Sequence, residues 1–177
     1  THRSSRRPRW LADGKSVAFE SNRRGAVDIW LLRGGDRDPV QLTTASTMEF
    51  RPRPSPTDDW IVFDRTDDDL DRSYVMRSDG SSVRPLLPPA LNDHTRICCV
   101  AWAPDGRRLT ASVSPAVGLN TLGLVRFDPE TGVVTNLTTV DLPGSSEEYG
   151  RFSPDGRYIA YESNTDGHWD LWLVHAD

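Results

Sequence analysis

Apolar residues along this chain occur in short runs separated by polar segments rich in Gly, Asp, Asn and Ser. In the clearest pair, the runs at 158–161 and 170–173 flank a polar break at 163–167, and a Ser-Pro-Asp-Gly turn at 153–156 precedes them. Short runs of aromatic and β-branched residues are typical of β-strands, and a Pro-Asp-Gly turn reverses the chain at little steric cost. The pattern predicts two antiparallel strands joined by a hairpin.

This unit occurs four times. The copies are 44, 48 and 50 residues apart when they are aligned on the turn positions Ala12, Pro56, Pro104 and Pro154. A period of about 40 to 50 residues with several short strands in each unit is typical of propeller blades. We therefore predict an all-β chain, a β-propeller built of four-stranded antiparallel blades with about four blades per chain.

The repeats account for nearly all of the chain, so we expect a single propeller region over residues 1–177. The expected blades cover approximately residues 6–43, 48–87, 95–138 and 148–177. The last blade lacks its outer strand, which leaves an open edge. One hypothesis is that two chains form a homodimer that closes one ring of eight blades, because a twofold axis satisfies closure simply. The alternatives are a compact ring within one chain and a piece of a longer chain.

Composition narrows the class of partner. The net charge of −5 argues against a general nucleic-acid binder, and the sequence has no run of about 20 apolar residues that would insert into a membrane. It also has no signal-peptide pattern. Cys98 and Cys99 are the only two cysteines. Because neighbours on a strand point to opposite faces, we expect two small buried residues and no intrachain disulfide, with a reactive thiol as the alternative.

Motifs for catalysis are absent from the sequence. It contains no Gly-x-Ser-x-Gly elbow, no phosphate-binding loop and no His-Glu-x-x-His pair. The four histidines lack the spacing of metal ligands; they are His2, His94, His168 and His175. We therefore expect no catalytic residues, no enzyme activity and no cofactor.

An acidic run in the second repeat is a weak candidate for a Ca²⁺ site. Asp67, Asp69 and Asp71 are alternate carboxylates in a hairpin, and Ca²⁺ prefers oxygen ligands. The run lacks the glycine and the distal Glu of an EF-hand loop, however. A solvated hairpin tip is therefore the favoured interpretation.

Two further recurrent features are expected to build the blades. Arg9, Arg53 and Arg151 occupy the same place in three repeats, and we expect them to pair with Asp28 or Asp170 across strands. The recurrent tryptophans are expected to pack between blades; they are Trp10, Trp30, Trp102 and Trp172.

The repeated motifs resemble those of a known family. A Trp/Phe-(Ala/Ser)-Pro-Asp-Gly-Arg turn, a (Phe/Tyr)-Glu-Ser-Asn segment, a Gly-x-x-Asp-(Ile/Leu)-Trp-Leu strand and a Leu-Thr ending resemble the TolB-like β-propeller repeat, one of the WD-like repeats, over about 170 of the 177 residues. The resemblance implies protein binding at the funnel face and a periplasmic or extracellular location, with the cytoplasm as the alternative. Similar repeats form the propellers of prolyl-oligopeptidase-like hydrolases and of some lyases.

Function is expected where the repeats differ, because shared residues build blades and variable loops face partners. The connections into the innermost strands vary, and by resemblance they surround the channel mouth. They supply Arg3, Arg6, Glu49, Asp93, His94, Arg96, Glu147, Glu148 and Tyr149. This mixed-charge rim suits a protein or peptide partner, so we predict a non-enzymatic propeller that binds such a partner at its funnel face. The alternatives are a propeller domain of a hydrolase or lyase, and a self-associating scaffold.

Overall fold

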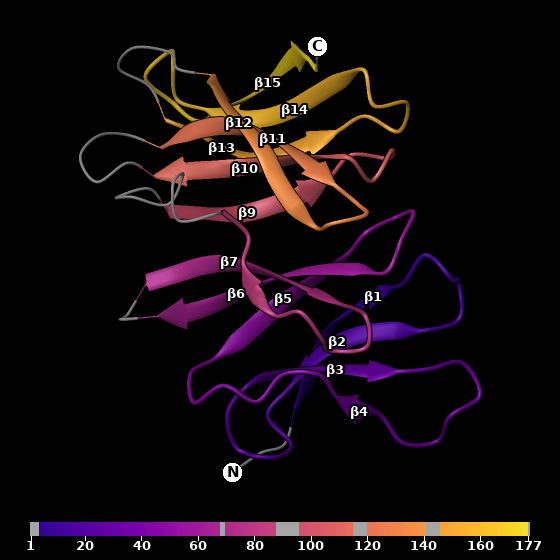
Figure 1. Cartoon of the computed structure of the whole chain (residues 1–177). Helices are drawn as coiled ribbons and strands as arrows, with labels where there is room; N and C mark the ends of the chain where they lie inside the picture. Colours follow the sequence, from indigo (N-terminus) through magenta and orange to yellow (C-terminus); the bar gives the residue numbers. More distant parts are fainter. Residues whose placement is uncertain (1–3, 68–69, 88–95, 115–119, 141–145, 177) are drawn as a thin grey trace. The chain divides into compact units, whose positions relative to one another are not determined.

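The computed structural model describes residues 4–67, 70–87, 96–114, 120–140 and 146–176, which form strands and no helices (Figure 1). Consequently, no helix in these segments could cross a membrane. Thr1–Leu86 forms one compact unit and Leu87–Asp177 forms the other. Each unit contains two antiparallel sheets.

The first unit holds two four-stranded sheets whose strands follow one another in sequence order. The first sheet consists of β1 (Ser5–Trp10), β2 (Val17–Ser21), β3 (Asp28–Leu32) and β4 (Val40–Gln41). The second sheet consists of β5 (Glu49–Pro54), β6 (Trp60–Asp67), β7 (Leu70–Arg77) and β8 (Arg84–Pro85).

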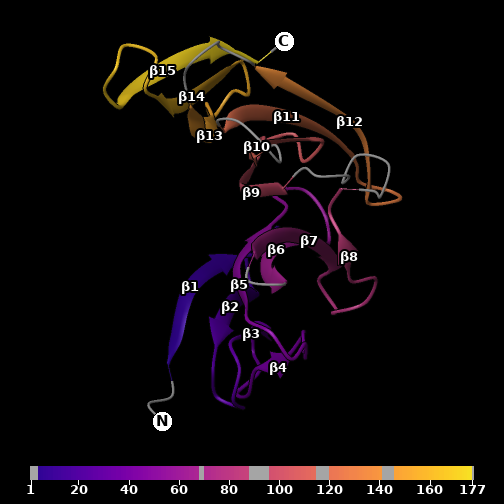
Figure 2. The same ribbon diagram turned by 90° about the vertical axis from the view of Figure 1, so that its left-hand side faces the viewer.

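The second unit repeats this arrangement. The third sheet consists of β9 (Arg96–Trp102), β10 (Arg108–Ser114), β11 (Thr121–Asp128) and β12 (Val133–Val140). The fourth sheet consists of β13 (Glu147–Phe152), β14 (Tyr158–Ser163) and β15 (Asp170–His175), with β15 at an edge (Figure 2). The predicted all-β architecture of four-stranded antiparallel sheets is confirmed, and the fourth sheet has three described strands.

The Asp-Gly turns connect the first two strands of a sheet through side-chain caps. Asp13 Oδ1 accepts hydrogen bonds from the backbone N–H groups of Lys15 and Ser16, both at 2.8 Å, and Gly14 has a φ of 64°. Asp155 caps the corresponding turn of the fourth sheet, where it accepts from Ser153 and from the N–H of Arg157. The hydroxyl of Ser16, which donates to Asp13 Oδ2 at 2.6 Å, and the hydroxyl of Ser153 contribute most to holding the pKa of these two carboxyls below its usual range, and the backbone N–H groups add to the effect. The turns are therefore structural, as their recurrence predicted.

The core of each unit lies between its two sheets, and the two cores use the same positions. In the first unit, Ala18, Ile29 and Leu31 of the first sheet belong to one buried cluster with Ile61 and Phe63 of the second. In the second unit, the corresponding cluster joins one third-sheet residue to three near the end of the chain; its buried members are Leu122, Ile159, Tyr161 and Ala176. Strand register therefore defines a forward face, which packs on the next sheet, and a rear face, which packs on the preceding one.

The recurrent tryptophans only partly follow their predicted role in packing. Trp172 is half-buried against the core of the second unit, and Trp102 contacts Phe127 edge-on at 5.0 Å. Trp30 is buried, and the Arg23 guanidinium lies 4.7 Å from its ring centroid. Trp10, in contrast, is 68% exposed on β1. Its position in the repeat belongs to the rear face of the first sheet, on which no other sheet of the first unit packs.

Candidate functional site

The first strand of every sheet contains a β-bulge at the same place. Its pairing with the second strand shifts register in all four sheets. At this place one non-glycine residue has a positive φ: Arg7 at 50°, Arg51 at 52°, Cys99 at 57° and Tyr149 at 55°. We call these four the bulge residues. Among the described residues, Ser82 is the one other non-glycine with a positive φ. A left-handed backbone costs a non-glycine residue about 1 kcal/mol, so a fourfold occurrence is a built feature.

The side chains at the bulge differ, although the backbone repeats. Two sheets carry Arg there, one carries Cys and one carries Tyr. A backbone shape that recurs in every sheet serves the scaffold, whereas a side chain that changes from sheet to sheet on that scaffold suits recognition. The bulge residues therefore differ between repeats, which is the property that we expected of a binding surface and looked for in the loops.

Each compact unit fixes its bulge with the same hydrogen bond between sheets. In the first unit, the N–H of Arg51 donates to Glu20 Oε2 on β2 at 3.0 Å. In the second unit, the N–H of Tyr149 donates to Ser112 Oγ on β10 at 3.2 Å. Glu20 and Ser112 occupy the same register position, and their oxygens accept from the N–H group of the bulge residue.

A second backbone bond accompanies the first. The N–H of Glu49 donates to the carbonyl of Val27 at 2.7 Å, and the N–H of Glu147 donates to the carbonyl of Asn120 at 3.0 Å. These bonds bring the start of β5 and of β13 against the preceding sheet. The bulge residue that follows two positions later is therefore held at a defined place.

Arg7 and Arg51 combine anchoring with exposure. Arg7 Nη1 lies 2.5 Å from Glu20 Oε1, and its side chain is 48% exposed. Arg51 Nη1 lies 3.5 Å from Asp64 Oδ2 and 3.8 Å from Asp71 Oδ2, with 39% of the side chain exposed. The Arg51 guanidinium also lies 5.0 Å from the ring centroid of Phe50. A guanidinium has five N–H donors, so both side chains retain donors that face solvent.

The expected pairing of the recurrent arginines is wrong for Arg53. Its two terminal nitrogens donate to both oxygens of the fully buried Asp64 at 3.2 and 2.8 Å, and Ser73 Oγ also donates to Asp64 at 2.9 Å. Asp28 instead accepts from Gln41 Nε2 at 2.8 Å. The bulge shifts the register between β5 and β6, which brings Arg53 to a carboxylate on the neighbouring strand.

Two predicted rim residues lie in the interior, and this corrects their assignment. Glu49 is 0% exposed and accepts from Arg65 Nε and Nη2 at 3.0 and 2.6 Å. Glu147, at the same position of the fourth sheet, is also fully buried, with Ser163 Oγ at 3.5 Å. The backbone bond of each residue to the preceding sheet places its side chain between sheets.

A second buried carboxylate lies near Glu49. Asp28 is 3% exposed, and its Oδ1 is buried with no hydrogen-bond partner among the described residues. Burial, together with the negative charge of Glu49, raises the pKa of Asp28 to about 6. The first unit therefore holds a carboxyl group that titrates close to neutral pH.

The remaining predicted rim residues fall into three groups. Arg6 and Tyr149 are exposed, as a partner-binding surface requires. Glu148 is half-buried, and its Oε1 accepts from Asn120 Nδ2 at 2.6 Å. Arg96 begins β9, although its side chain lies outside the described residues, as do Arg3, Asp93 and His94 altogether.

The acidic run lies on the β6–β7 hairpin. Tyr74 Oη donates to Asp67 Oδ2 at 2.6 Å, and Thr66 Oγ1 donates to Asp71 Oδ1 at 3.1 Å. Asp69 lies outside the described residues. Within the part of the chain that the structure describes, no three His, Cys, Asp or Glu side chains are grouped closely enough to hold a metal ion.

The sequence carried only a faint signal for the bulge. The residue after it is Pro8 in the first repeat, Pro52 in the second and Gly150 in the fourth. Such residues often mark irregular strands, but they do not reveal where the register shifts or which side chain the shift exposes.

Comparisons with known proteins agree with this architecture. No protein-family profile matches the chain. An uncharacterized protein of Agrobacterium fabrum, Atu1656, is 30% identical over 173 residues, which cover 96% of this chain and 54% of that protein. The chain thus spans about half the length of the curated relative it matches.

Solved structures superpose on most of this chain although their sequences are only distantly similar to it. TolB from Acinetobacter baumannii superposes with a TM-score of 0.64 at 20% identity, over 96% of this chain and 40% of that one. A puromycin-hydrolyzing peptidase of Mycobacterium tuberculosis superposes with a TM-score of 0.71 at 15% identity, over 98% of this chain and 28% of the peptidase. At such identities the likeness establishes architecture alone. This chain has the β-propeller fold.

Proposed function

We propose that this chain is a non-enzymatic propeller of the TolB-like type that binds a protein or peptide segment through the bulge residues of its first unit, Arg7 and Arg51. The observation that carries the proposal is the repeated bulge, which presents Arg from two sheets, Cys from one and Tyr from one on the same backbone shape. The resemblance of the repeats adds a periplasmic or extracellular location to the proposal.

The chemistry of the first unit favours an acidic segment as the partner. Arg7 and Arg51 are half-exposed, and each is held by a carboxylate that limits its motion. A pre-oriented guanidinium binds carboxylates through paired hydrogen bonds and loses little side-chain entropy in doing so. Phe50, beneath Arg51, adds an apolar surface beside the charge. A peptide with Asp or Glu next to an apolar residue fits this combination.

A random peptide library displayed on phage tests the proposal against the immobilised chain. We expect the selected peptides to be enriched in Asp and Glu. Measured by fluorescence anisotropy, a selected peptide should bind the Arg7→Gln or Arg51→Gln variant roughly tenfold more weakly, because each substitution removes charge-assisted hydrogen bonds.

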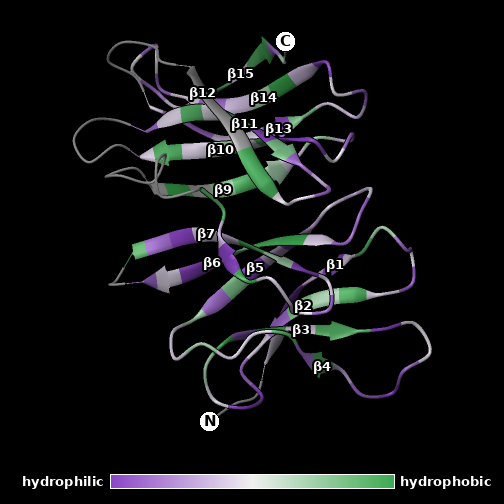
Figure 3. Ribbon diagram, in the orientation of Figure 1, coloured by the Kyte–Doolittle hydropathy of each residue, from purple (hydrophilic) through white to green (hydrophobic). Residues whose placement is uncertain are grey.

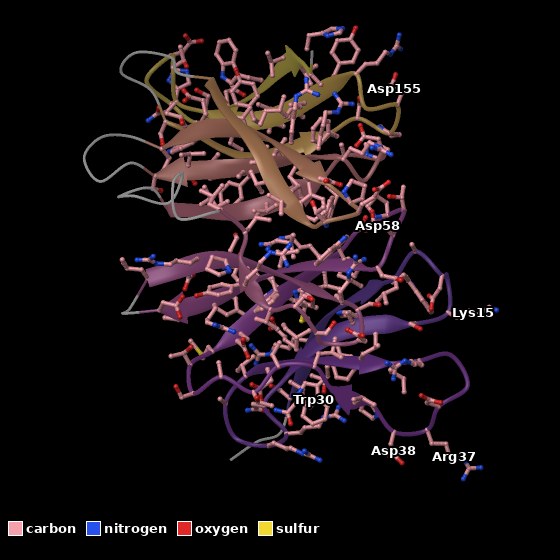
Figure 4. All side chains as sticks on the ribbon, in the orientation of Figure 1. Lys15, Trp30, Arg37, Asp38, Asp58 and Asp155 are labelled. Carbon is pink, nitrogen blue, oxygen red and sulfur yellow. The ribbon has the colours of Figure 1, made fainter. Side chains whose placement is uncertain are left out.

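Arg37→Gln is the matched control. Arg37 lies in the β3–β4 loop, where it points outward from the first sheet as Lys15 and Asp38 do (Figure 4). Its substitution removes the same charge as Arg7→Gln or Arg51→Gln does. The affinity of this variant for the selected peptide should match that of the unsubstituted chain. Equal binding by all three variants would show that the bulge residues do not form the site.

The likeness to a peptidase supports a second candidate, a propeller that forms part of a hydrolase. Release of p-nitroaniline from aminoacyl p-nitroanilides tests whether the chain itself carries hydrolase activity. The proposal expects no turnover above a blank without protein, and turnover by the purified 177-residue chain would contradict a non-enzymatic propeller.

A further inference from the structure

The forward face of the fourth sheet is apolar and uncovered. Leu171 and Leu173 on β15 are 77% and 73% exposed. Figure 3 shows hydrophobic colouring on β15, and Tyr158 on the neighbouring strand is also exposed. Exposed apolar residues that gather on one sheet face, rather than scatter singly, mark an interaction surface.

The same register positions are buried in the other sheets. Leu171 pairs with Glu162 across β14 and β15, just as Ile29 pairs with Glu20 across β2 and β3. Ile29 is fully buried in the core between the first and second sheets. Leu122 has the equivalent place in the third sheet and is buried against the fourth. The fourth sheet therefore presents a forward face of the kind that packs on a following sheet elsewhere in this chain.

The first sheet carries the complementary rear face. Val17 and Phe19 on β2 occupy the positions of Ile61 and Phe63, which are buried against the first sheet. Val17 and Phe19 are only half-buried, and what covers part of Phe19 is the Arg23 guanidinium, 5.3 Å from its ring centroid, rather than another sheet of the first unit. Trp10 has the position of Phe152, which packs against the third sheet, yet it is exposed. One chain thus carries both halves of the interface that joins its own sheets.

We propose that the fourth sheet of one copy docks its forward face on the rear face of the first sheet of a second copy. Leu171 and Leu173 would pack against Trp10, Val17 and Phe19 of the other copy. This contact continues the packing already present within each unit. It does not depend on the peptide-binding function, because it uses no side chain of the bulge residues.

Two hydrogen bonds repeat across the existing interfaces and specify how the copies meet. Glu162 has the position of Glu20, which accepts from the N–H of the next bulge residue. Glu162 of one copy should therefore accept from the N–H of Arg7 of the other. The carbonyl of Trp169, at the position of Val27, should accept from the N–H of Ser5. Trp169 lies just before Leu171 in the chain, and Glu162 pairs with Leu171 across the two strands. Both acceptors therefore lie beside an apolar residue that the contact buries.

A second copy is the occupant to which the chain itself points. Both faces needed for the contact are present on every copy. In a closed assembly every forward face meets a rear face of another copy, whereas a contact that does not close would extend into a polymer.

Sedimentation velocity of the 177-residue chain provides the test, at concentrations from about 1 to about 100 µM, which bracket micromolar dissociation constants. We expect a mass of two copies or more. Leu171→Glu should return the chain to the monomer with its circular dichroism unchanged, since the side chain is exposed. Val133→Glu, which changes an exposed apolar residue at the start of β12, is the control and should leave the assembly intact.

Mixing two variants decides which faces meet. Trp10→Glu damages only the rear face and Leu171→Glu only the forward face, so each variant alone should be monomeric. Mixed together, the two should form a heterodimer through one intact forward face and one intact rear face. A monomeric unsubstituted chain would assign the face to another occupant and overturn the proposal. The proposal would also be overturned if Trp10→Glu alone formed a dimer and its mixture with Leu171→Glu gave no heterodimer. Those two results would indicate contact between the fourth sheets of two copies.

Discussion

Two buried carboxylates of the first unit, Glu49 and Asp28, differ in how their charge is compensated. Glu49 accepts two hydrogen bonds from Arg65, whereas Asp28 has Gln41 and one oxygen with no hydrogen-bond partner among the described residues. A buried charge without a cation is costly, so the pKa of Asp28 rises until protonation competes. The charge of Asp28 therefore opposes folding at neutral pH.

Asp28→Asn should remove this cost. The pKa of Asp28 is about 6 in the folded protein against an ordinary value of 3.8, so the folded state binds the proton more tightly. Stability should consequently fall as pH rises from about 4 to about 6, by up to about 3 kcal/mol at about 1.4 kcal/mol per pH unit. The Asn variant should be more stable above pH 6 and similar below pH 4, as measured by urea unfolding across this range.

Asp170→Asn is the control for this prediction. Asp170 has the same register position in the fourth sheet but is exposed. Its substitution should change the free energy of unfolding by less than about 0.5 kcal/mol at any pH. A stability difference for Asp28→Asn that does not vary with pH would contradict the assigned titration.

At the scale of the element, the first strand of each sheet depends on close contact with the sheet before it. In the second unit, Thr110 Oγ1 donates to the carbonyl of Gly150 at 2.7 Å, directly after the bulge. A Cβ on Gly150 would lie 2.5 Å from Leu122 Cδ1 and 3.1 Å from Thr110 Cβ. The strand therefore needs a glycine there because of space rather than backbone conformation.

Gly150→Ala should destabilise the chain by about 1 to 3 kcal/mol, since overpacking forces neighbours out of position. Urea unfolding followed by tryptophan fluorescence measures the change. Gly167→Ala is the comparison: its Cβ meets nothing within 4 Å, but φ is +85°, so it carries only backbone strain of about 1 kcal/mol. Equal losses for the two variants would count against close packing at Gly150.

At the scale of the whole molecule, salt should separate the two proposed interactions. Peptide binding at Arg7 and Arg51 is electrostatic and partly exposed, and the Debye length shortens from about 10 Å at 0.1 M to about 3 Å at 1 M salt. Docking between copies buries apolar surface, which salt does not screen. Raising NaCl from about 0.1 to about 1 M should therefore weaken peptide affinity severalfold and leave the sedimenting mass unchanged. A parallel loss of both would mean that the contact between copies is itself electrostatic.

The repeat in the sequence determined the architecture by itself. Short apolar runs, Asp-Gly turns and the recurring Asp-(Ile/Leu)-Trp-Leu strand specify local structure, and local signals of this kind repeat wherever the fold repeats. Four antiparallel sheets followed from them. The capping of the turn by Asp13 was also within reach, because an Asp side chain bonds to the backbone two residues on.

Only the tertiary structure decided where the variable positions lie. Glu49 and Glu147 read as loop residues in the sequence but are buried, because backbone bonds between sheets draw the start of β5 and of β13 inward. The bulge at Arg7 and Arg51 depends on a register shift between paired strands, which alternation along one strand does not record. Exposure at Leu171 depends on whether another sheet packs there, although its position resembles buried Ile29 in every local respect. Local sequence fixes the strand, and contact between sheets decides which of its faces is free.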